Sequence, residues 1–358
     1  MFTVFPVRFG VTARQIFLAG TILLAAVAHA QLAVTSVNYG TLVDGTNSSH
    51  GGLTFQEQNT PVNFVTTSSG DYKFTGPVAS AVNFRRNTSE AGPNNSTVFY
   101  QMTSGSSTQP LGNFEASMSA MMLSNNLTEG LRNPFANGAG AQNSNIERID
   151  FTLSNYVVQA NDALVFFDLE NTGNFGDGFR IAAFTATGTV NGFTNAPTTY
   201  ANAGILVAAG SFGGPINSPT NGTTGTFVRS TYTNGDSLTG TPSTTLLTNG
   251  TSSPLNLVGI LIRFSDLGLS AGSTIQGFSL MAGDVPITTG SSLVDWTNTA
   301  VYSANTDPNA YGNMDFAGFG SQVARPVPEL SSYGAIFISG TLLALGVRRY
   351  RRIRRSEE

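Results

Sequence analysis

The sequence predicts an all-β body between residues 31 and 325, with an antiparallel β-sandwich or jelly-roll-like fold. Short apolar segments in this region alternate with polar residues at a period of two, which is the pattern of half-buried strands. Turn-forming Gly and Asn separate these segments every roughly 8 to 15 residues. No long amphipathic helix interrupts the series, so parallel βαβ units with helical crossovers are not expected.

Five segments carry the strand pattern most clearly: 149–153, 163–167, 179–183, 257–264 and 274–281. In the first, apolar residues alternate with Asp150 and Thr152, which predicts one buried and one exposed face. In the fourth, one predicted face holds four apolar residues, Val258, Ile260, Ile262 and Phe264. Residues 114–131 have a loose helical period that is broken at 125–126, so they predict a short helix or an irregular strand.

Three stretches of the body are less regular. Residues 213–254 contain 33 Gly, Ser, Thr, Asn or Pro among 42 residues, which predicts long loops with an edge hairpin around 225–232. The weaker strand pattern before residue 145 leaves a sub-boundary there open. Residues 321–328 are expected to link the body to the C-terminal segment.

The composition excludes several classes of function. Residues 31–325 include nine basic and eighteen acidic residues. This excess of acidic residues argues against binding to nucleic acid, because phosphate neutralisation needs a basic surface. The chain has no cysteine, so disulfide scaffolds, thiolate metal sites and cysteine nucleophiles are excluded. Its two histidines are His29 and His50. His50 lies in a Ser- and Gly-rich stretch without a nucleophile elbow nearby, so a Ser-His-Asp site is not expected.

The N-terminus predicts a secretory signal helix over residues 1–30. Arg8 and Arg14 form a positive region, residues 16–27 form an apolar run, and Ala28 and Ala30 form a small-x-small cleavage site. Twelve apolar residues are too few to span a bilayer unaided. Signal peptidase is therefore expected to leave a mature chain that begins at Gln31.

The C-terminus predicts a transmembrane helix. Residues 334–347 are free of charge, and extension back to residue 330 gives eighteen residues, about 27 Å of helix, which can just span a bilayer. Six arginines follow: Arg348, Arg349, Arg351, Arg352, Arg354 and Arg355. Dense arginine beside an apolar span stays on the cytoplasmic side of the membrane. The body is thus expected to be exported and held by its C-terminal segment.

The residues just before this span form a motif. Val327, Pro328, Glu329 and Ser331 are followed by the apolar helix and the terminal arginine cluster, and Leu330 stands where the motif has a second proline. In this order, residues 326–358 resemble the PEP-CTERM sorting domain of Gram-negative bacteria. The resemblance covers about the last thirty residues.

The resemblance implies a route and partners. It implies recognition by an exosortase, an integral-membrane cysteine transpeptidase, and cleavage near the motif. An inner-membrane-anchored precursor would then deliver its body to the cell surface or extracellular matrix, in contact with exopolysaccharide. Because Leu330 replaces the second proline of the motif, it stays open which exosortase variant acts and where it cuts.

Acidic residues supply the remaining candidate sites. Glu147 and Asp150 could form a glycosidase pair, but their odd spacing places them on opposite faces of a strand. Asp168 and Glu170 have even spacing and would share a face. Charged strand ends are the simpler interpretation of both pairs. A Gly-containing loop groups the hard oxygen ligands that calcium prefers, at Asp168, Glu170, Asn174 and Asp177. An ordinary Asn/Asp/Gly turn is the alternative, because the spacing does not fit an EF-hand. Residues 305–315 form a weaker candidate loop of the same kind.

Three functions follow from these observations. The first is an exported, non-catalytic surface or matrix protein. The second is a carbohydrate-binding or adhesive module that uses calcium or an aromatic residue such as Trp296, the only tryptophan. The third is a secreted polysaccharide-degrading enzyme, which would need two carboxylates in one groove. The absence of a recognisable catalytic motif favours the first.

Overall fold

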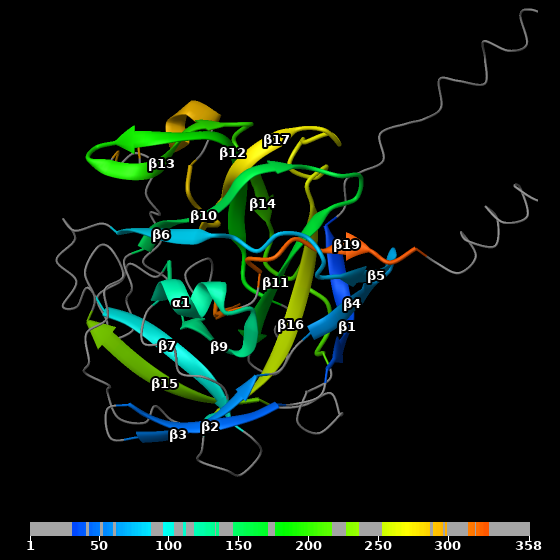
Figure 1. Cartoon of the computed structure of the whole chain (residues 1–358), viewed down its shortest axis with the longest axis vertical. Helices are drawn as coiled ribbons and strands as arrows, with labels where there is room; N and C mark the ends of the chain where they lie inside the picture. The colour runs from blue at the N-terminus through cyan, green and yellow to red at the C-terminus, as the bar shows by residue number, and fades with distance from the viewer. Residues whose placement is uncertain are drawn as a thin grey trace, which may run out of the picture. The chain divides into compact units, whose positions relative to one another are not determined.

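The computed structural model describes most of the body. The described residues are 31–40, 43–50, 53–59, 62–86, 96–103, 110–111, 118–132, 134–135, 146–170, 176–216, 227–235, 253–286, 289–295, 298, 314–318 and 320–328. In these residues the fold is rich in β-strands, as predicted (Figure 1). The described helices are short: α1 (Met118–Leu123) and the 3-10 turn η1 (Gly290–Leu293).

The described strands form two sheets. The main path of the larger sheet runs in the order β19 (Arg325–Pro326), β5 (Gly70–Lys73), β4 (Val62–Thr67), β1 (Leu32–Tyr39), β16 (Ser253–Arg263), β15 (Phe227–Gly235), β7 (Ser96–Thr103), β8 (Pro110–Leu111), β3 (Leu53–Asn59) and β2 (Val43–His50). Off this path, β11 (Ala163–Glu170) pairs with β16, β9 (Asn126–Arg132) pairs with β7, and β18 (Phe316–Gly318) pairs with β9.

The smaller sheet has the order β13 (Phe193–Tyr200), β12 (Phe179–Val190), β17 (Thr274–Ala282), β10 (Ile146–Val157) and β6 (Ala81–Arg86), with β14 (Ile205–Val207) beside β12. Among the described strands every pairing is antiparallel except the short contact between β3 and β8. Both sheets combine strands from before and after residue 145.

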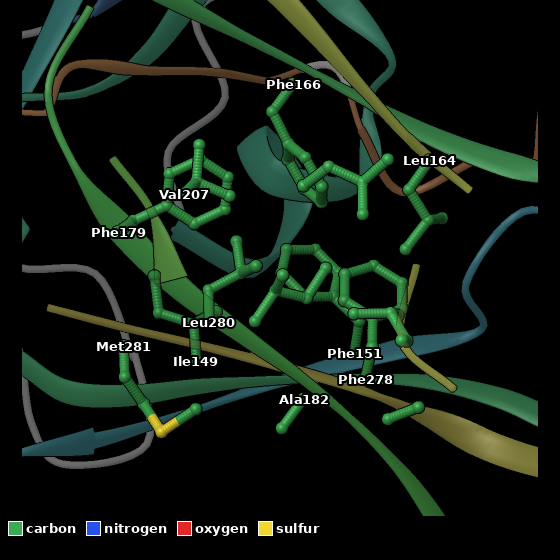
Figure 2. Close-up of a cluster of buried hydrophobic side chains, with 14 of the residues drawn as sticks. Ile149, Phe151, Leu164, Phe166, Phe179, Ala182, Val207, Phe278, Leu280 and Met281 are labelled. Atoms are coloured by element: carbon green, nitrogen blue, oxygen red, sulfur yellow. The ribbon is translucent and has the colours of Figure 1, made fainter. Parts of the chain in front are cut away.

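One hydrophobic core draws on both sheets. The smaller sheet contributes residues of β10, β12 and β17, and the larger sheet contributes alternate residues of β11 and β16. Figure 2 shows the centre of this cluster, where Phe151 and Phe278 stack with ring centroids 4.8 Å apart. The predicted faces are confirmed at ten buried positions: Ile149, Phe151, Leu153, Val258, Ile260, Ile262, Phe264, Phe278, Leu280 and Phe179.

A second core lies on the opposite face of β11. Val165, Phe167 and Leu169 pack there with residues of β1, β4 and β16, whereas Leu164 and Phe166 face the first core. β11 is therefore buried on both faces, which explains why its sequence is a continuous apolar run rather than an alternation. Gly259 is the register partner of Phe167, and a Cβ on it would lie 2.9 Å from that ring, so the glycine leaves room for the phenyl group.

Two expectations for the body need correction. The strand found near residues 225–232, β15, is not at an edge, because it pairs with β16 on one side and with β7 on the other. Asp150 does not lie on an exposed face, since its side chain is 1% exposed. Residues 114–131 do contain the short helix expected, and Asn125 ends it with a left-handed φ of 52° before β9 begins.

Candidate functional site

The predicted sorting motif begins directly after the last described strand, β19. Pro326 pairs with Tyr72 across β19 and β5, and the Val327 N–H donates to the Asp71 carbonyl at 2.7 Å. Pro328 follows and is exposed. The other predicted sorting and cleavage residues lie outside the described residues: Ala28, Ala30, Glu329, Ser331 and the six arginines between 348 and 355. The predicted membrane span over 334–347 lies outside them too, and no helix within the described part is long and apolar enough to cross a bilayer.

Residues 320–327, here called the strap, are part of the body rather than a linker. Backbone hydrogen bonds join them to two separate segments. Ala79 N donates to Ser321 O at 2.7 Å, and Ala324 exchanges two bonds with Ala163, at 2.8 and 2.9 Å. Val323 and Ala324 are fully buried. The linker expectation is therefore wrong for these residues: β19 pairs with β5 at the edge of the larger sheet (Figure 1), and Val323 and Ala324 lie in the two cores.

Arg325 fastens the end of the strap. Its Nε donates to Asp162 Oδ1 at 3.2 Å, and its Nη2 donates to the Tyr156 hydroxyl at 3.3 Å. Tyr156 donates in turn to Asp162, and Asp162 also accepts the Gln159 N–H at 2.7 Å. Asp162 is almost fully buried. Burial, together with the hydrogen bond to Asp162, raises the pKa of Tyr156 to about 12, so the neutral phenol persists at physiological pH.

The calcium candidate centres on Asp168, whose carboxylate is fully buried. Its Oδ2 accepts the Asp177 N–H at 2.9 Å and its Oδ1 accepts the Asp315 N–H at 2.8 Å. The residue therefore holds two chain segments to β11. The Glu170 side chain and Asn174 lie outside the described residues. Within the described ranges no three His, Cys, Asp or Glu side chains gather in a way that could hold a metal, and a calcium ion at Asp168 stays a prediction.

We expect Asp168→Asn to lower the free energy of unfolding by about 1–3 kcal/mol, because an amide can offer only one acceptor oxygen to the two backbone N–H groups. Urea unfolding measures this, in EDTA and in added calcium. We expect the same loss in both solutions. Asp177→Asn is the matched control, since it keeps the backbone N–H that Asp168 binds. If calcium instead stabilised the parent protein and both variants lost this stabilisation, the result would favour the metal site.

A second buried charge cluster lies on the smaller sheet. Asp150 Oδ2 accepts Arg85 Nε at 3.2 Å and Arg148 Nη2 at 3.1 Å, and Asp150 Oδ1 accepts the Ser279 hydroxyl at 2.7 Å. Both guanidinium groups are 3% exposed, and burial lowers the pKa of Arg85. Ser279 and Tyr200 hydrogen-bond at 2.7 Å.

Elements distant in sequence cover this cluster. Arg148 donates to the Leu293 carbonyl in η1, and the Arg85 guanidinium lies 5.0 Å from the Phe193 ring centroid in β13. The Asp150 carboxylate is thus neutralised by two arginines, which does not suit the glycosidase pair with Glu147. Sequence reasoning missed the cluster; the even spacing of Arg148 and Asp150 was the one available signal, because it places both side chains on one face.

The side chains of two further candidates lie outside the described residues. His50 ends β2, where the structure describes the backbone alone, and Trp296 lies outside the described residues. Comparison of the chain with protein-family models, curated proteins and solved structures finds no match. The assignment of a function therefore depends on the chain's own residues.

Proposed function

We propose that this chain is an exported, non-catalytic protein of the cell surface or extracellular matrix of a Gram-negative bacterium. A PEP-CTERM/exosortase-like system sorts it. The observation that carries the proposal is the order of features after the body: the motif at 327–331, the apolar span at 334–347 and the six terminal arginines. The signal-like pattern at residues 1–30 supports export.

The proposed route follows from the charge and hydropathy of the two ends. The signal directs the chain across the membrane and signal peptidase cuts after Ala30. The C-terminal span then stops transfer, and its arginines stay cytoplasmic. The body folds outside the cytoplasm, where the exosortase-like enzyme reaches the motif. Release or transfer places the acidic body among exopolysaccharide chains.

A sandwich or jelly-roll-like body is the finer fold that we propose. The first core supports it, since side chains of β10, β12 and β17 meet those of β11 and β16 from the other sheet. The partners of two buried carboxylates, Asp150 and Asp168, support a non-catalytic body. Asp150 is engaged by two arginines, and Asp168 by two backbone amides, so both carboxylates serve to hold the fold.

Intact mass and C-terminal peptide mapping of the protein from its native host test this function. We expect a mature chain that begins at Gln31 and ends between residues 328 and 331. Replacement of all six terminal arginines by glutamine is expected to accumulate unprocessed chain, because the orientation signal is lost. Replacement of the same six by lysine keeps the charge and is the matched control. A parent chain from the host that retains residues 348–355 would contradict processing.

A further inference from the structure

We propose that the folded body fixes the upstream limit of tail processing: the strap, residues 320–327, stays in the sheet, and the enzyme cuts on the C-terminal side of Pro328. The Arg325–Asp162–Tyr156 group acts as the clamp that sets this limit. The inference rests on the proposed sorting function for the identity of the enzyme. Its structural part concerns the body alone and is tested separately.

Burial along the strap changes at the motif. Ser321, Val323 and Ala324 are fully buried, the next three residues are half-buried, and Pro328 is exposed. An enzyme that attacks a peptide bond must reach its carbonyl carbon, so bonds before residue 325 are shielded by the body. The residue that follows the strap, Pro328, is exposed and is also a residue of the predicted motif.

Backbone pairing extends the protection through Val327. Arg325 and Pro326 are in register with Lys73 and Tyr72 of β5, and Val327 N donates to Asp71 O. Proteases and transpeptidases bind extended segments through main-chain hydrogen bonds. Cleavage within a paired strand therefore needs local opening first, and its rate follows the population of the open form.

The clamp opposes that opening. Release of the strap would separate Arg325 from Asp162, whose carboxylate is 1% exposed, and would leave a buried charge with fewer donors. At the other end of the strap, Gly320 fits against the core at a φ of 132°, where a Cβ would lie 2.9 Å from the Phe166 ring. The strap is thus held at both ends.

The chemistry fixes what each product carries. The enzyme thiolate attacks the scissile carbonyl carbon, the C–N bond breaks, and the departing amine takes a proton, which leaves a thioester on the body. An amine, a hydroxyl or water then displaces the thiolate. Because a residue spans at most about 3.6 Å, a linkage at Ser331 lies within roughly 14 Å of Val327. The body is therefore joined to its acceptor almost without a spacer.

Limited proteolysis of the purified full-length protein in detergent micelles tests the limit without the host enzyme. The probe is proteinase K, and the readout is the C-terminus of the first stable product by mass spectrometry. We expect an end at Pro328 or later. Arg325→Ala is expected to move the end into residues 320–327 and to speed cleavage there about tenfold. Asp162→Ala is expected to act in the same direction.

Lys73→Ala is the matched control, because Lys73 is exposed on β5 opposite Arg325 and its backbone pairing is kept. A parent product that ends within 320–327, or an Arg325→Ala product that is identical to the parent, would overturn the inference. In the host, a mature end within 320–327 would also overturn it. An uncut chain in the host would contradict the proposed sorting function. The proteolysis result would still show whether the strap stays in the sheet and limits cleavage.

Discussion

Asp150→Ala is expected to lower the free energy of unfolding by about 3–5 kcal/mol, because it leaves two buried guanidinium groups without their shared carboxylate. Arg85 and Arg148 are each 3% exposed, so water cannot replace the lost partner. The Ser279 hydroxyl loses its acceptor in the same step. Chemical denaturation in urea, with an unchanged dependence on denaturant, measures the loss.

Asp295→Ala is the control for this variant. Asp295 is exposed and accepts a hydrogen bond from Asn191, so its removal is expected to cost about 0–1 kcal/mol. Asp150→Asn keeps the side-chain volume and one acceptor. Its loss of free energy of unfolding is expected to lie between those of Asp150→Ala and Asp295→Ala. A loss below about 1 kcal/mol for Asp150→Ala would mean that the cluster is solvated.

Phe166→Ala is expected to lower the free energy of unfolding by about 3–5 kcal/mol, because it opens a cavity at the centre of the first core. Among the described residues, the ring of Phe166 has three aromatic neighbours, at centroid distances of 5.4 Å to Phe179, 6.1 Å to Phe278 and 6.4 Å to Phe316. These neighbours come from three other strands, so movement of a single strand cannot fill the cavity that Phe166→Ala leaves.

Val157→Ala provides the comparison for Phe166→Ala, since Val157 is 52% exposed and is expected to change stability by about 0.5 kcal/mol or less. Thermal and urea unfolding of both variants gives the difference. Equal losses in the two variants would show that Phe166 does not lie in a closely packed core.

The strand faces of the body could be predicted from the sequence. The alternation over 149–153, 257–264 and 274–281 placed the right residues in the first core, because side chains of a strand alternate between two faces whatever its partners are. The Asn pair at 125–126 ended a helix for an equally local reason, since Asn tolerates a left-handed backbone. The proposed export signal and the proposed sorting motif likewise rest on contiguous sequence.

What covers each face was decided by the tertiary structure. Period two puts Asp150 on the face opposite the first core. The two arginines that bind its carboxylate contact Leu293 of η1 and Phe193 of β13, which are distant in sequence. Residues 321–328 were expected to be a linker, yet Arg325 hydrogen-bonds Asp162, which lies 163 positions earlier in the sequence. Such contacts leave no local pattern. They arise because a buried charge and an unpaired sheet edge must each find a partner, and only the folded chain brings that partner near.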